Sequence, residues 1–377
     1  IRLDSYLQTI TDRRTQVDGF GYQFSVTQPL FNLPAYYNYQ RGAGVAARAQ
    51  LQKVQAKSDF IDLFSQTYLE IVANSLRIQN INETLGAYEA QRDLIAKQYE
   101  TGFVKPSDLQ QAEASLATLK SQAIVVKNNL SVSFSALELL LQTDVAAVHG
   151  LIEALDKIDV LDKTLASYVM KFKDNVDYKV AKANVNIADK ELKANSSLSM
   201  PSVAASLRYS DNHLENTFDY QSNNTLYQDG VTFAVQLTIQ LYAGGGDTYR
   251  KRASAYSYES SKLQKQFIEH QTQQAIRTTY LNLKAGLALV NSRKKSVSAS
   301  RVALDNANLE YRTGIGQYAD VRTSQDRLFE ETNSLIVDKV TLINNYFVLA
   351  RLTGEEPDMT VKNMKIIFTG EVINNEG

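Results

Sequence analysis

Cysteine and tryptophan are absent from this 377-residue chain, and the missing cysteine excludes several kinds of site. Without cysteine there is no disulfide framework, no thiolate metal centre and no cysteine nucleophile. The residues given also hold no N-terminal cysteine that could carry a lipid. His149, His213 and His270 stand far apart, without the spacing of metal ligands. We therefore expect no cofactor, no bound metal and no enzymatic centre.

Charge of one sign is also lacking, because 40 basic residues balance 41 acidic ones. Nucleic-acid binding usually requires a basic face, so no nucleic-acid partner is expected. No uninterrupted apolar run approaches the length of a membrane-spanning helix, which predicts that no transmembrane helix is present. Proline and glycine are few, at 5 and 17 residues, and this favours long continuous elements.

One stretch of the chain occurs twice. Tyr99-Glu-Thr-Gly-Phe-Val-Lys-Pro-Ser-Asp108 returns as Tyr311-Arg-Thr-Gly-Ile-Gly-Gln-Tyr-Ala-Asp320, an offset of 212 (311 minus 99). At the same offset Leu116 falls on Leu328. A match that keeps its register over so long a span indicates an internal duplication. We predict two structural repeats, residues 1–163 and 164–377.

Each repeat is predicted to contain two strands followed by two helices. The expected elements are strands 1–12 and 20–31, helices 34–98 and 107–142 and a connecting segment 143–163, then helix 164–195, strands 202–210 and 230–242, helices 247–311 and 318–352 and a tail 354–377. Leucines at heptad spacing along 107–142 and 318–352 indicate coiled-coil packing. Because a helix precedes the strands only in the second repeat, we expect a matching helix and a signal peptide before Ile1.

The junctions between strands and helices have their own signals. Pro34 suits the first turn of a helix, where its missing N–H costs nothing. Gly244, Gly245 and Gly246 indicate a flexible joint, because no Gly-Lys-Ser/Thr follows to make a phosphate cradle. Ser107 is expected to cap the second helix of the first repeat.

The strand over 230–242 alternates strictly between apolar and uncharged polar residues. Val231, Phe233 and Val235 fall on its apolar face. Two hairpins cannot close a sheet alone, but strands shared by several identical chains can close a barrel that crosses a bilayer. The alternative is a soluble coiled-coil scaffold, in which the hairpins cap the bundle and this face is buried in protein.

These motifs resemble those of the TolC-like outer-membrane channels of efflux pumps and type I secretion systems. The resemblance rests on the duplicated turn, Gln28-Pro-Leu-Phe31, Gln240-Leu-Tyr-Ala-Gly-Gly245 and Met200-Pro-Ser-Val203, and it covers nearly the whole chain. It implies an α+β membrane protein whose trimeric β-barrel, with four strands per chain, continues into a long periplasmic α-helical barrel.

The resemblance also implies a function and partners. The chain would form a passive exit duct in the outer membrane of a Gram-negative bacterium, projecting into the periplasm. Its expected partners are two further copies in a homotrimer, a periplasmic adaptor protein, an inner-membrane transporter and outer-membrane lipid.

The family's functional positions can be carried over to the two turns. By resemblance, the adaptor-docking residues are Thr101, Gly102, Phe103, Val104, Thr313, Gly314, Ile315 and Gly316. The simpler alternative is that Gly102 and Gly314 only supply a turn with positive φ.

Asp320 is the implied pore-facing acid, and Asp108 with Tyr311 the implied closing link. Helix capping is the alternative for both aspartates. Gly316 replaces an arginine link and Thr323 a second acid of the family pattern. A three-fold ring of Asp320 alone would still favour cations.

Overall fold

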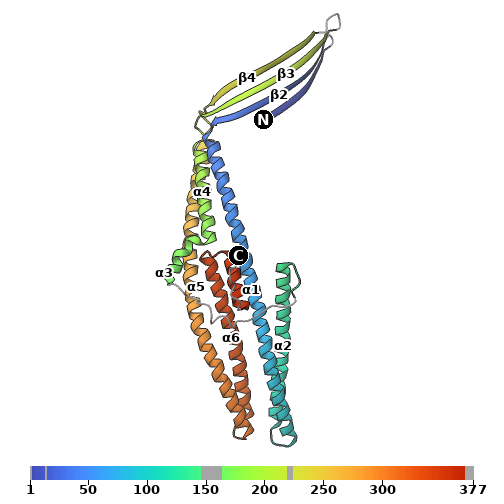
Figure 1. The fold of residues 1–377 in the computed structure, drawn as a ribbon, viewed down its shortest axis with the longest axis vertical. Helices are drawn as coiled ribbons and strands as arrows, with labels where there is room; N and C mark the ends of the chain where they lie inside the picture. The colour runs from blue at the N-terminus through green and yellow to red at the C-terminus, as the bar shows by residue number, and fades with distance from the viewer. Residues whose placement is uncertain (1, 13–14, 146–163, 219–223, 370–377) are drawn as a thin grey trace, which may run out of the picture. The chain divides into compact units, whose positions relative to one another are not determined.

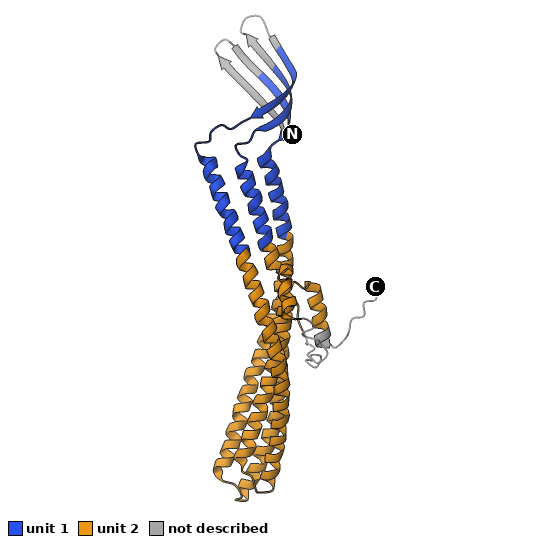
Figure 2. Cartoon of the chain, turned by 90° about the vertical axis from the view of Figure 1, so that its left-hand side faces the viewer, with its two compact units in different colours: residues 1–49, 181–265 blue, residues 50–180, 266–377 orange. Residues whose placement is uncertain are grey.

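The computed structural model describes residues 2–12, 15–145, 164–218 and 224–369. The chain divides into two compact units, which Figure 2 colours separately. Unit 1 consists of residues 1–49 and 181–265, and unit 2 of residues 50–180 and 266–377. Each unit takes residues from both halves of the sequence, so compactness divides the chain differently from the predicted duplication.

Unit 1 carries a four-stranded antiparallel sheet in the order β1-β2-β3-β4 (Figure 1). The strands are β1 (Arg2–Asp12), β2 (Thr15–Phe31), β3 (Ser202–Phe218) and β4 (Asn224–Thr238). Their register aligns the apolar positions, since Phe24 pairs with Tyr209 and Tyr209 with Val231. Period-two alternation therefore continues across neighbouring strands, as a two-faced sheet requires.

The strand limits differ from the sequence-based ones. The predicted strands 202–210 and 230–242 are too short where one follows the other, because β3 and β4 extend beyond these limits with polar pairs such as Asp211 with Asp229. Backbone ladders do not depend on apolar side chains. β4 ends at Thr238 instead of residue 242, because its partner Ser202 is the first residue of β3.

Helix α1 (Leu33–Glu100) follows β2 directly. Asn32 begins it, because its Oδ1 accepts a hydrogen bond from the backbone N–H of Ala35 at 2.9 Å. This is the usual N-cap geometry, and Pro34 occupies the first turn as predicted. Helix α5 (Gly246–Arg312) begins after Gly244 and Gly245, whose φ angles of 61° and 81° permit the change from strand to helix.

Unit 2 is built around two helical hairpins. α2 (Pro106–Leu141) returns along α1, and α6 (Tyr318–Leu352) returns along α5. The heptad leucines lie in the cores, with Leu116 packing on Ile81 of α1 and Leu349 in a cluster with Leu283 of α5. The coiled-coil interpretation of both shorter helices is therefore confirmed.

Two predicted segments of unit 2 have a different structure. The helix expected over 164–195 is divided into α3 (Leu165–Met170), a 3-10 turn (Lys171–Asp174) and α4 (Val176–Ser196). Asn175 causes the break, because its Oδ1 caps the N–H of Tyr178 at 3.1 Å. The expected tail contains a further helix, α7 (Pro357–Thr369). The predicted segment 143–163 lies mostly outside the described residues.

The start of α2 also corrects an expectation. Pro106 occupies its first turn and Lys105 its N-cap position, without any side-chain cap. Ser107 therefore does not cap the helix, because it already lies inside it. By length and composition alone, α2 is apolar enough to cross a membrane, because an 18-residue window within it has a mean hydropathy of 1.3. Lys127, Asn128 and Asn129 interrupt its apolar residues, so a search for unbroken runs does not find it.

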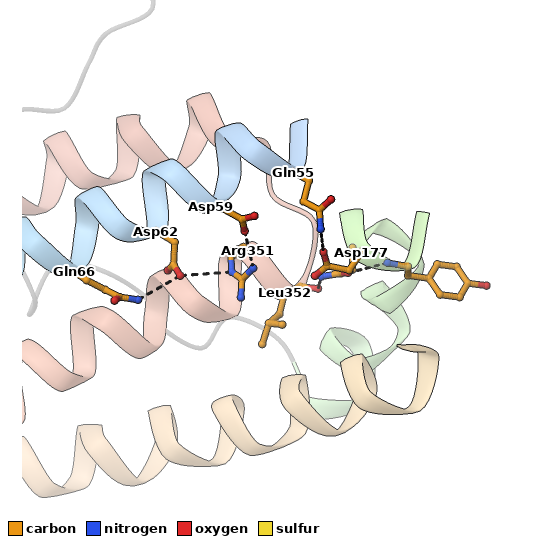
Figure 3. Close-up of polar contacts among 9 residues, drawn as sticks. Gln55, Asp59, Asp62, Gln66, Asp177, Arg351 and Leu352 are labelled. Atoms are coloured by element: carbon orange, nitrogen blue, oxygen red, sulfur yellow. Dashed lines mark hydrogen bonds and ion pairs between the residues drawn. The ribbon is translucent and has the colours of Figure 1, made fainter. Parts of the chain in front are cut away.

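A polar joint connects α6 with α1 and α4 inside unit 2 (Figure 3). The guanidinium of Arg351 lies 3.4 Å from the carboxylate of Asp59 and 4.0 Å from that of Asp62, both on α1. Asn175 donates to the backbone oxygen of Leu352 at 3.3 Å. The end of α6 is thus fixed by side chains from α1 and by the cap of α4.

Candidate docking turns and channel constriction

The two hairpin turns have the same backbone structure. Gly102 and Gly314 adopt φ angles of 76° and 79°. The N–H of Phe103 donates to the oxygen of Gln98 at 2.8 Å, and the N–H of Ile315 to that of Glu310 at 3.0 Å. This six-to-one hydrogen bond after a left-handed glycine defines a Schellman motif. The glycines therefore serve the turn, which is the simpler of the two interpretations.

Next to each glycine, the turn presents one large apolar side chain to solvent. Phe103 is 85% exposed and Ile315 is 83% exposed. Single exposed apolar side chains are common on protein surfaces, so this exposure alone does not identify a docking site. Thr101 and Thr313 point back instead, because their hydroxyls donate to carbonyls of the preceding helical turn. Docking by all eight predicted residues remains a prediction.

Gly316 has little room for a side chain. A Cβ atom at this position would lie 3.0 Å from the Cβ of Glu310 and 3.1 Å from the backbone nitrogen of Tyr311. A side chain here, including the arginine of the family pattern, requires the turn to shift. The second turn is thus more compact than the first, where Val104 occupies the equivalent position.

Asp320 lies in the first turn of α6 and is exposed. Its Oδ2 accepts a hydrogen bond from the backbone N–H of Gln317 at 3.2 Å, as part of a capping box. Capping is therefore one role of this carboxylate. Its predicted place in a pore constriction is not tested by a single chain and stays a prediction, as does the role of Thr323.

Tyr311 contacts a residue that sequence reasoning did not select. Its hydroxyl donates to Oε1 of Gln98, at the end of α1, at 2.6 Å. Burial of the phenol raises the pKa of Tyr311, and the negative charge of Asp108 adds to this effect. Ile95, Ala112 and Tyr318 form the apolar cluster beneath this contact. The predicted closing link between Asp108 and Tyr311 stays a prediction.

A second polar contact joins the hairpins farther from the turns. The buried Tyr88 of α1 donates a short hydrogen bond to Asp326 of α6. Burial and this carboxylate raise the pKa of Tyr88. A cavity of about 480 Å³ adjoins the pair, lined also by Leu119, Arg322 and Phe329. No local motif indicates this contact, because its two residues are separated by 238 positions.

The described residues contain no group of histidine and acidic residues arranged to hold a metal ion. His213 packs its ring against Tyr227 with a centroid distance of 4.3 Å. At the strand–helix joint, the N–H of Gly246 donates to the oxygen of Ala243, as in an ordinary turn.

Comparisons with known proteins confirm the resemblance to TolC-like channels. Proteases secretion protein PrtF of Dickeya chrysanthemi is 20% identical over 99% of this chain and 81% of its own length. Outer membrane protein TolC of Salmonella enteritidis is 21% identical over 90% of this chain and 70% of its own. No protein-family model matches the chain.

The fold agrees with these relatives. The crystal structure of CusC, described in terms of transmembrane channel formation, superposes with a TM-score of 0.80 at 14% sequence identity. The match covers 94% of this chain and 83% of CusC. The chain therefore has the fold of outer-membrane channel proteins, and its sequence relatives are named for outer-membrane location and for secretion.

Proposed function

We propose that this chain is one subunit of a homotrimeric exit duct in the outer membrane of a Gram-negative bacterium. The duct serves a tripartite efflux pump or a type I secretion system, and it is a passive channel. An inner-membrane transporter supplies the driving force, and a periplasmic adaptor protein opens the duct. Its sequence relatives include proteins named for protease secretion and proteins named for an efflux pump, which supports both kinds of system.

The exposed apolar face of β4 carries the proposal. Val231, Phe233, Val235 and Leu237 alternate along the strand, and each is more than half exposed. At about 25 cal/mol per Å², leaving such side chains in water costs free energy, whereas lipid would cover them. β1 and β4 are the edge strands of the described sheet, and an edge in a bilayer must pair. Three copies that share their edges would form one closed barrel of twelve strands.

Single-channel conductance in a planar bilayer tests this function. The wild-type protein is expected to insert and to carry small, cation-selective currents, because a ring of three Asp320 carboxylates attracts cations. A well-folded protein that never inserts would contradict the duct and favour the soluble scaffold.

Two variants separate the charge of Asp320 from its capping role. Asp320→Asn removes the charge and keeps an oxygen acceptor for the N–H of Gln317, whereas Asp320→Ala removes both. Both should lose cation selectivity, and only the alanine variant should lose about 1 kcal/mol of stability. Unchanged selectivity in both would restrict Asp320 to capping.

A further inference from the structure

The duplication and one hydrogen bond together define a contact between chains. The hairpin α1–α2 packs on the hairpin α5–α6 within one chain, and at the turn end Tyr311 donates to Gln98 at 2.6 Å. The repeat offset of 212 places Gln98 on Glu310 and Tyr99 on Tyr311. The equivalent bond would therefore join Tyr99 to Glu310, which belong to the opposite repeats.

That equivalent bond is not formed inside the chain. Tyr99 and Glu310 are both exposed, and neither side chain has a hydrogen bond or ion pair in the described part of the chain. Their chemistry is complementary, since a phenol can donate to a carboxylate and such charge-assisted bonds are strong. The donor Tyr99 and the acceptor Glu310 are therefore both available, at the positions that correspond to Tyr311 and Gln98 in the repeat.

Apolar residues along the same helices also differ in exposure between the two repeats: one is buried, and its repeat counterpart is exposed. Leu69 of α1 is 2% exposed in a cluster with Ile343 of α6, whereas its repeat counterpart Leu281 of α5 is 51% exposed. Ile336 of α6 is 7% exposed, whereas its counterpart Ile124 of α2 is 62% exposed. Surfaces covered within the chain thus have uncovered equivalents on α5 and α2.

We infer that Tyr99 of one chain donates a hydrogen bond to Glu310 of the next chain, at a seam between α5 and the neighbouring α1–α2 hairpin. This inference rests on the proposed trimer and assigns the residues that join its subunits at the turn end. Bonds between Gln98 and Tyr311 and between Glu310 and Tyr99 then alternate around the ring. The occupant of the exposed α5 and α2 surfaces is a second copy of this chain.

Crosslinking tests the assignment directly, because the chain has no cysteine of its own. Tyr99→Cys/Glu310→Cys is treated with a short bismaleimide, since residues that meet through a tyrosine hydroxyl are too far apart for a disulfide. Most chains are expected to migrate as covalent dimers and trimers. The matched pair Gln98→Cys/Tyr311→Cys should react within one chain and leave its mass on a denaturing gel unchanged. Tyr99→Cys/Leu281→Cys should not link.

The oligomeric state of the same samples separates two failures. Native mass spectrometry that finds trimers, combined with no link between positions 99 and 310, overturns this inference and leaves the proposed duct intact. Finding only monomers overturns the trimer and the inference together.

Mild variants provide a second measurement that does not require cysteines. Tyr99→Phe removes the donor and Glu310→Met removes the acceptor at nearly the same side-chain length, so each should lower the temperature at which trimers dissociate, and the double variant should lower it no further. Additive effects would show that the two side chains do not interact.

Discussion

Among the described glycines whose surroundings are known, Gly354 has the least space for an added side chain. Its φ angle is 74°, and an added Cβ would lie 2.3 Å from the backbone oxygen of Asp174. We expect Gly354→Ala to lower the free energy of unfolding by roughly 3 kcal/mol, from overpacking and left-handed strain.

Far-UV circular dichroism during denaturation measures this effect, with Gly42→Ala as the control. Gly42 lies inside α1 with open space around its Cβ position. Alanine there should stabilise the helix by about 0.5–1 kcal/mol. Equal effects of the two substitutions would contradict close packing at Gly354.

Tyr88 should make the stability of unit 2 depend on pH in the alkaline range. Burial and the hydrogen bond to Asp326 raise its pKa, so folding favours the neutral phenol. Its contribution to stability is complete below the unfolded pKa of about 10 and is lost as the pH rises above that value. The melting temperature of Tyr88→Phe should therefore fall less steeply above pH 10 than that of the wild type.

The control for this measurement is Tyr256→Phe, because the Tyr256 side chain is 76% exposed. This variant should follow the wild-type curve. Some alkaline loss should persist in Tyr88→Phe, since burial also raises the pKa of Tyr68 and Tyr318. Identical curves for Tyr88→Phe and the wild type would contradict a role for this phenol.

At the scale of elements, the two hairpins use different chemistry at equivalent positions. Arg293 of α5 binds Glu331 and Asp338 of α6, each at 3.0 Å. The offset of 212 places these residues on Ile81, Leu119 and Val126, which pack together between α1 and α2. An ionic contact in one repeat thus stands where the other repeat has an apolar one.

Substitution of this ionic contact should be strongly non-additive. Arg293→Ile leaves two carboxylates close together without their cation, so the melting temperature should fall. Arg293→Ile/Glu331→Leu/Asp338→Val copies the first repeat and should recover most of the loss, because well-packed apolar residues often replace partly buried ion pairs without cost. A triple variant less stable than Arg293→Ile would contradict this equivalence.

The periodic spacing of apolar residues predicted most of the helices and strands, because the buried face of an element recurs with that period. The limits of α1, α5 and α6 agree with the sequence to within two residues, since apolar heptads and the turn glycines define them. The break at Asn175 and the length of β3 could not be predicted in this way. They depend on a cap within a continuous polar pattern and on pairing of polar residues across strands.

At the scale of the whole chain, the sequence located the turns but not their contacts. Gly102, Gly314, Phe103 and Ile315 follow from a repeated motif, which is visible in sequence. The bonds from Tyr311 to Gln98 and from Tyr88 to Asp326 join residues more than 200 positions apart. Whether such residues meet depends on how the two hairpins pack. Local patterns in one sequence do not show which distant residues lie close together in space.

The bond between Tyr88 and Asp326 has one more consequence. Its repeat counterparts are Ser300 and Ala114, whose short side chains cannot span the same gap. At the level of Tyr88, a ring of three such chains would therefore alternate between contacts that are held by a hydrogen bond, inside each subunit, and contacts without this bond, between subunits. A mechanical load at this level would be relieved mainly between subunits, so the wall would dilate there while the two hairpins of each chain stay together.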